Sequence, residues 1–203
     1  MAYRRTPQIQ ARLDAQRQAI LAGAAQLLAE QGYAGCSMAG VAARAGIASG
    51  TLYNHFTSKS DLLAELFRTV VTREVEAVRA AAAAESSALD RTTAVIETFA
   101  GRALKQPRRA YALLAEPVDP AVDELRLEFR RAFRDVIAAA VEQGVADGEL
   151  PPQNPTVVAA ALVGAIGEAL VGPLASGVAE PDAVPTLIEF AHRAVGGTAR
   201  AHA

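Results

Sequence analysis

Small polar side chains lie close together in one short segment of this chain, between Ser49 and His55. Thr51 can offer both a hydroxyl and a methyl group to base edges, and Asn54 can pair with adenine or reach a phosphate. Gly50 permits a close approach of the backbone to a partner. The chemistry of this segment is therefore that of recognition by hydrogen bonding.

The patterns that support catalysis or metal binding are missing from the sequence. His55, His192 and His202 lie far apart, with no cysteine or carboxylate at ligand spacing around them. There is no glycine-rich phosphate loop and no nucleophile elbow. We therefore expect no enzymatic activity, no metal and no cofactor. The single cysteine, Cys36, excludes an intrachain disulfide, and we expect it to be a buried thiol before a helix cap rather than a redox sensor.

The elements that position these side chains are predicted to be helices throughout, because no period-2 alternation typical of strands is found. Hydrophobic residues make up 51% of the 203 residues and charged residues 21%, as in ordinary soluble proteins. Abundant alanine favours helix, since alanine loses no side-chain entropy there. Apolar residues at helical spacing predict helices at about 15–31, 38–45, 49–56, 58–84, 95–104, 108–115, 121–147, 156–174 and 182–195.

Capping residues mark several of these boundaries. Gly32 follows the first helix, at the position where helices commonly end with a residue in the left-handed region. Ser37 is placed to cap the second helix. Gly46 ends the second helix, so that two short helices flank a tight turn. Ser58 and Asn154 are placed to begin later helices. By geometry alone, residues 37–56 fit equally a helix-turn-helix, which presents its second helix to the DNA major groove, and an ordinary helical hairpin.

The residues within this unit resemble the signature of the TetR family of transcriptional regulators. They are Ala45-Gly46-Ile47, the run from Gly50 to Phe56, Lys59, and Leu62-Leu63. The resemblance is close over about residues 12–73, and beyond it extends to architecture only. It implies an all-α protein with an N-terminal three-helix helix-turn-helix DNA-binding domain at 12–74, motif 37–56. A larger C-terminal helical domain at 75–203 would bind an effector and dimerise.

The same resemblance implies roles for individual residues. The expected phosphate contacts are Ser37, Tyr53, His55 and Lys59, the expected base readers are Ala48, Ser49, Gly50, Thr51 and Asn54, and Arg44 is expected to reach a phosphate or a base. Gly40 departs from the family, whose members commonly carry a longer residue there, so one phosphate contact fewer is expected. Arg4 and Arg5 fit either an arm in the minor groove or a solvated tail.

Charge is distributed unevenly along the chain. The net charge is −2, but residues up to Glu74 hold eight basic and five acidic side chains, which leaves twelve basic and seventeen acidic ones in the remainder. A basic N-terminal part joined to an acidic body suits a protein that touches a polyanion with one end only.

The C-terminal part contains candidates for an effector site. Six apolar and aromatic residues could line a pocket or simply form core: Phe99, Leu104, Tyr111, Leu114, Phe129 and Phe133. Glu168 interrupts an apolar helix, which places it either in the effector cavity or in a dimer interface. The scarcity of aromatic residues predicts a small apolar or amphiphilic effector.

The sequence thus predicts a homodimeric repressor that an effector releases from operator DNA, with dimer contacts through about 156–174 and 182–195. An activator or a ligand-independent repressor of the same fold remains open, as does, from another class, a helical small-ligand carrier that does not bind DNA. The longest apolar stretch, Val157 to Gly167, is shorter than a bilayer span, and the N-terminus lacks the apolar segment of a signal peptide. We therefore expect a cytoplasmic protein without a membrane partner.

Overall fold

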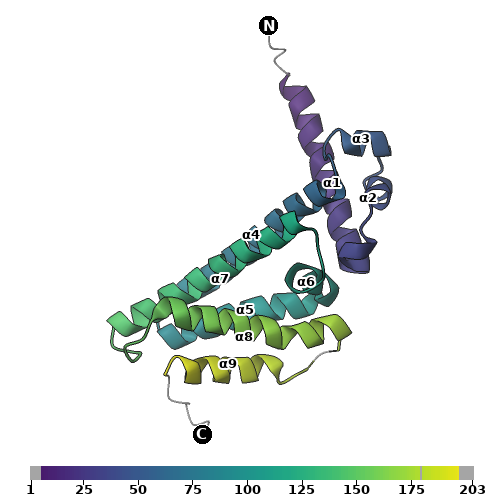
Figure 1. The fold of residues 1–203 in the computed structure, drawn as a ribbon. Coiled ribbons are helices and arrows are strands. Elements are labelled where there is room, and N and C mark those ends of the chain that lie inside the picture. Colours follow the sequence, from purple (N-terminus) through teal and green to yellow (C-terminus); the bar gives the residue numbers. More distant parts are fainter. Residues whose placement is uncertain (1–5, 179, 197–203) are drawn as a thin grey trace.

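The computed structural model describes residues 6–178 and 180–196, and within them the chain forms nine α-helices and no strand (Figure 1). The helices are α1 (Pro7–Gly35), α2 (Met38–Arg44), α3 (Ser49–Tyr53), α4 (Lys59–Ala83), α5 (Ala88–Lys105), α6 (Pro107–Leu114), α7 (Pro120–Ala146), α8 (Pro155–Ser176) and α9 (Ala183–Ala194). The predicted all-α class is confirmed. Arg4, Arg5 and His202 lie outside the described residues.

Three helices differ from their predicted bounds by three residues or more at one end or both, and one of them, α5, begins at Ala88, seven residues earlier than expected, with Ser87 as its cap. α1 begins at Pro7, eight residues earlier than expected, because the Thr6 hydroxyl accepts a hydrogen bond from the Ile9 N–H and proline occupies the first helical position. α3 ends at Tyr53 rather than Phe56. The Ser37, Ser58 and Asn154 side chains cap α2, α4 and α8 as predicted.

Gly32 interrupts α1 near its end. Its φ of 73° is positive as expected, but its ψ of −173° lies outside the left-handed helical region. That combination is accessible almost only to glycine. The chain therefore turns sharply at Gly32 before one more turn of α1 carries it to Gly35.

Two hydrophobic cores stabilise the fold, and α4 contributes to both. The N-terminal core contains the buried faces of α1–α4 together with Ala112, Val122 and Leu125 from α6 and α7. The C-terminal core contains residues of α5–α9 together with Val78 and Ala82 from α4. α4 packs along α7, and α7 along α8 (Figure 1). The predicted division between residues 74 and 75 therefore falls inside a continuous helix, and it stays a prediction.

α8 leaves much of its surface uncovered. An 18-residue window of this helix has a mean hydropathy of 2.0 and only 33% of it is buried, so by length and composition the helix could cross a membrane. The expectation of a shorter apolar stretch was wrong, because Glu168 alone interrupts a helix that stays apolar to Ala175. One such helix is weak evidence for a membrane. Val157 on α8 is 62% exposed and Phe190 on α9 is 47% exposed.

Candidate functional site

The helix α3 is held by its inner face and presents its outer face to solvent. Leu52 is fully buried against Val41 and Ala42 of α2, and Gly46 turns the chain between the two helices with a φ of 66°. The predicted base readers Ala48, Ser49, Gly50 and Asn54 are exposed, and Thr51 is half-buried. Of the predicted phosphate contacts on this segment, Tyr53 is 53% exposed and His55 is half-buried. These residues form one outward polar surface.

Ser37 lies at the start of α2 and is exposed, with its hydroxyl 3.1 Å from the Gly40 N–H that it caps. A Cβ atom on Gly40 would lie 3.1 Å from the Ser37 Oγ and 3.2 Å from a Leu27 methyl carbon. Packing therefore explains the glycine at this position, because a side chain there would lie too close to both the Ser37 cap and the buried Leu27.

Two predicted DNA-contacting cations make contacts with the protein's own chain. The Arg44 guanidinium donates to the Glu30 carboxylate, with 2.8 Å between Nη1 and Oε1, and this ion pair lowers the pKa of Glu30. The Lys59 Nζ donates to the Tyr33 carbonyl at 2.7 Å and lies 4.6 Å from the centroid of the Tyr33 ring. Lys59 has three N–H donors and can share one with a phosphate. Arg44 would have to leave or share Glu30 to reach DNA.

Arg17, a residue that the sequence did not single out, fixes the end of α3. Its Nε donates to Glu65 at 2.8 Å, its Nη1 donates to the His55 carbonyl at 3.0 Å, and its guanidinium lies 4.3 Å from the centroid of the Phe56 ring. The hydrogen bond with Glu65 raises the pKa of Arg17. Its partners are 38 or more residues away along the chain, so no local pattern reveals this role.

Cys36 is 1% exposed, as predicted for a buried thiol. Burial raises the pKa of this thiol. The neutral form is therefore favoured in the folded protein.

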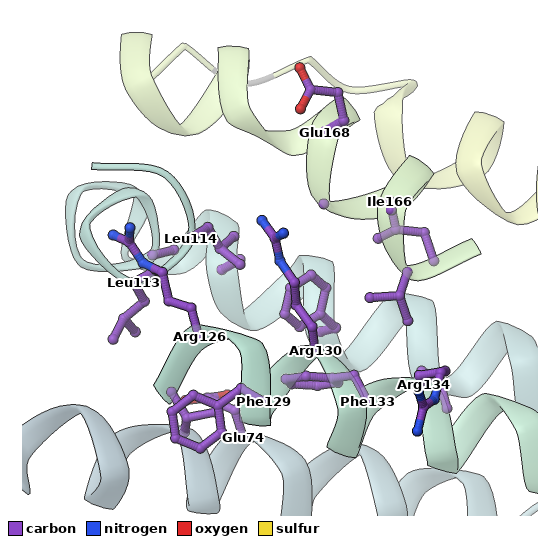
Figure 2. A pocket seen from close by; sticks show the side chains of 18 of the residues that line it. Glu74, Leu113, Leu114, Arg126, Phe129, Arg130, Phe133, Arg134, Ile166 and Glu168 are labelled. Atoms are coloured by element: carbon purple, nitrogen blue, oxygen red, sulfur yellow. Dashed lines mark hydrogen bonds between the residues drawn. The ribbon is translucent and has the colours of Figure 1, made fainter. Parts of the chain in front are cut away.

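A cavity of about 560 Å³ lies among α4–α8 (Figure 2). The predicted residues Phe99, Leu114, Phe129 and Phe133 line it, and the Phe99 and Phe133 rings meet edge to face with centroids 4.9 Å apart. Glu168 lines the cavity and is also exposed on α8, so both of its predicted locations remain open.

Leu104 and Tyr111 were predicted to line the same pocket, and the structure places them elsewhere. Both side chains pack against the C-terminal core. α5 turns Phe99, Arg102 and Ala103 toward the cavity, so Leu104 lies on a different face of the helix.

Arginines dominate the polar lining of the cavity. Six of them border it, against the two carboxylates Glu74 and Glu168: Arg102, Arg109, Arg126, Arg130, Arg131 and Arg134. Glu74 pairs with Arg102 and with Arg109. Sequence reasoning missed this feature by following only the apolar stripe of α7. The spacing of Arg126, Arg130 and Arg134 at i, i+4 and i+8 was a usable signal, because it places all three on one line of the helix.

Comparisons with known proteins agree with this architecture. Residues 20–66 match the family model described as bacterial regulatory proteins, tetR family. The chain is 32% identical over 129 residues to the HTH-type transcriptional repressor KstR2 of Rhodococcus jostii (strain RHA1), a match that covers 60% of this chain and 63% of that relative. The chain therefore matches somewhat less than two thirds of the length of this curated relative.

Solved structures share the whole fold. A transcriptional regulator FadR from Bacillus subtilis, in complex with stearoyl-CoA, is 20% identical with a TM-score of 0.76, covering 89% of this chain and 98% of that one. A tetR family regulator from Shewanella sp. PV-4 is 26% identical with a TM-score of 0.65, covering 88% and 97%. Residues 20–66 therefore match the N-terminal domain of the tetR family of bacterial regulatory proteins, and the helices of the described residues share the fold of these solved regulators.

Proposed function

We propose that this chain is a homodimeric transcriptional repressor that binds operator DNA through α2 and α3 and leaves it when an effector occupies the cavity. The observation that carries the proposal is the outer face of α3, whose polar residues are exposed while Leu52 anchors the helix from behind. Such a helix can enter the major groove. The name of the curated relative, a repressor, supports repression over activation.

The contacts with DNA divide into two groups in this proposal. Ser37, Tyr53, His55 and Lys59 hold phosphates, which fixes the register of the protein on the duplex but carries little sequence information. Ala48, Ser49, Gly50, Thr51 and Asn54 read base edges. Arg44 reaches DNA only when it gives up part of its contact with Glu30.

The exposed apolar surface of α8 and α9 supports dimerisation through these helices. Val157 and Phe190 expose large apolar side chains. On the same surface of α8, Gly164 and Gly172 are exposed, and a Cβ atom on either would meet nothing within 4 Å in the single protomer. Small residues let two helices approach closely, and the dimer must space its two α3 helices about 34–36 Å apart to reach successive major grooves.

The effector that fits the cavity is an amphiphile with an apolar body and an anionic group. Phenyl and aliphatic side chains suit the apolar body, and the excess of arginines over carboxylates suits the anion. The Bacillus subtilis FadR was solved with stearoyl-CoA, a ligand of this chemical class. An effector that binds more tightly to a dimer with wider spacing lowers the affinity for the operator. The protein would act in the cytoplasm, where its DNA lies.

Titration of the full chain against the promoter DNA beside its own gene tests DNA binding. We expect specific retardation of this DNA at low salt. Tyr53→Ala should weaken binding to operator and unrelated DNA alike, whereas Asn54→Ala should lower the preference for the operator by about 1–3 kcal/mol. Gln143→Ala, an exposed change on α7, is the control and should bind like wild type. Equal binding of both α3 variants and wild type would contradict DNA contact through α3, and no retardation at all would favour a ligand carrier that does not bind DNA.

A further inference from the structure

The cavity has a mouth between α6, the first half of α7, and α8. A smaller hollow of about 340 Å³ shares Leu114, Arg126, Leu127, Arg130, Glu168 and Val171 with the main cavity and opens it outward. In Figure 2, Arg126 reaches toward the end of α6, while Arg130, one helical turn along α7, reaches toward α8. Two guanidinium groups therefore border the same opening, together with the carboxylates of Asp123 and Glu168.

Arg126 is a buried cation whose charge is poorly compensated. Its side chain is 11% exposed, and its Nε and Nη2 donate to the carbonyls of Leu113 and Ala112 at 2.9 and 2.7 Å. Its carboxylate partner, Asp123, is 3.5 Å away and 64% exposed. Burial lowers the pKa of Arg126, and the charge of Arg130 acts in the same direction.

We propose that Arg126 and Arg130 bind the anionic group of the effector, and that Arg126 passes this occupation on to the DNA-binding domain through Glu116. This inference rests on the proposed function and deepens it. It assigns the headgroup of the ligand to one place in the cavity and names the residues that transmit its arrival. The shared chemistry of the ligands is an anion joined to an apolar chain, whether carboxylate or phosphate.

The first link of the transmission is a hydrogen bond from Arg126 to a main-chain carbonyl. Nη2 of Arg126 also donates to the carbonyl of Glu116, which lies in the segment that connects α6 to α7. An anionic oxygen is a stronger acceptor for a guanidinium than a neutral carbonyl. When an anion at the mouth takes this donor, the Glu116 carbonyl loses its partner and the connecting segment loses a restraint.

The second link joins that segment to α1. The Glu116 carboxylate accepts hydrogen bonds from the N–H groups of Tyr33 and Ala34, at 2.8 and 3.1 Å. Gly32 makes this approach possible, since a Cβ atom there would lie 2.9 Å from the Glu116 Oε2. Three residues further along, Asp119 accepts from the Tyr33 hydroxyl at 2.5 Å. One short segment therefore holds the end of α1 at both its backbone and its side chain.

The third link reaches the DNA-contacting surface. The Tyr33 carbonyl accepts from Lys59 at the start of α4, and Tyr33 packs edge to face on Phe67 of the same helix. Cys36 and Ser37, the cap of α2, follow Tyr33 by three and four residues in the chain. A shift of Tyr33 would therefore move α2. It would also change the hydrogen bond between the Tyr33 carbonyl and Lys59, the side chain that is expected to hold a phosphate.

Binding of three probes to the full chain by isothermal titration calorimetry tests the headgroup site. The probes are dodecanoyl-CoA, dodecanoate and the uncharged 1-dodecanol. We expect Arg126→Gln and Arg130→Gln to weaken at least one anionic probe about tenfold or more and to leave dodecanol within about threefold, as expected for a charge-assisted contact. Preference for dodecanoyl-CoA indicates a phosphate group, and preference for dodecanoate a carboxylate. Arg79→Gln is the matched control, because Arg79 is an exposed arginine of α4 outside the cavity lining, and it should stay within about threefold of wild type.

Equal losses for charged and uncharged probes, no loss, or no binding of either anion to wild type would overturn the headgroup site. These results are independent of DNA binding, so they are distinguishable from failure of the proposed function, which appears as absence of operator retardation.

Glu116→Gln tests the transmission. In wild type we expect the anionic probe to weaken operator binding about tenfold, within the usual range of coupling between sites. In Glu116→Gln the probe should bind as in wild type, yet its effect on operator binding should fall below threefold. Tyr33→Phe removes only the hydroxyl that donates to Asp119, so the probe should weaken its operator binding by an intermediate factor. This second variant keeps the test valid if Glu116→Gln fails to fold. Full coupling in both variants would contradict a route through Glu116.

Discussion

The surface of α3 and the cavity of the body, the two proposed recognition regions, are built in opposite ways. Around α3 the polar residues come from seven consecutive positions, point outward, and are anchored by one buried residue, Leu52. The lining of the cavity comes from five helices, and its charged residues surround an apolar interior. The basic N-terminal part keeps Arg44 and Lys59 in contacts with its own chain, whereas the acidic body concentrates arginines around its cavity.

This difference shows that net charge per domain is a poor guide to where an anion binds. The body carries more acidic than basic side chains, yet its cavity is lined by six arginines and two glutamates. Local placement decides the potential that a ligand meets, because nearby charges in a partly desolvated cavity interact more strongly than distant exposed ones.

The largest expected effect is a loss of operator binding at α3 caused by a substitution on α8. Gly172→Glu on α8 should leave the protomer folded, since a Cβ atom there meets nothing within 4 Å, but should place a charge in the proposed dimer interface. Because two linked α3 helices gain avidity, loss of the dimer should weaken operator binding about 10²–10⁴-fold. Light scattering should show the mass falling from that of a dimer to that of one chain, 21.1 kDa. A variant that stays dimeric and binds normally would place the interface elsewhere.

The second effect separates the inner from the outer face of α3. Leu52→Ala should destabilise the protein by about 2–5 kcal/mol, because Leu52 is fully buried and its truncation leaves a cavity. Tyr53→Ala, one residue on and 53% exposed, should change stability by less than about 0.5 kcal/mol. Denaturant unfolding measures both. Similar losses of stability in the two variants would mean that α3 is not anchored by one face.

The smallest effect concerns the charge of the cavity. Glu74→Gln removes a carboxylate that pairs with Arg102 and Arg109. The net positive charge of the cavity rises, and an anionic amphiphile such as dodecanoyl-CoA should bind about fivefold more tightly, equivalent to about 1 kcal/mol. Dodecanol, titrated in parallel, should be unaffected. Weaker binding of the anion would show that Glu74 positions its arginines for the ligand rather than competing with it.

Much of the region around α2 and α3 could be predicted from the sequence because its determinants are local. The Ser37 cap, the turn at Gly46 and the apolar spacing of Val41 and Leu52 each act over a few residues, and the structure shows all of them. The resemblance of the same stretch to a known family added roles for its exposed residues. Those roles remain predictions, although their exposure agrees with them.

The sequence by itself determined the helices, their caps and the outward polar face of α3, since helical periodicity and capping depend on neighbours within one or two turns. Only the tertiary structure decided that Arg17 meets Glu65, that Glu116 holds the end of α1, and that the arginines of α7 face a shared cavity. Those contacts join residues 48 and 83 positions apart, or residues of separate helices, and they arise from how amphipathic faces pack. A pattern read along one helix specifies which residues share a face, but the helix that packs against that face is chosen by the whole fold.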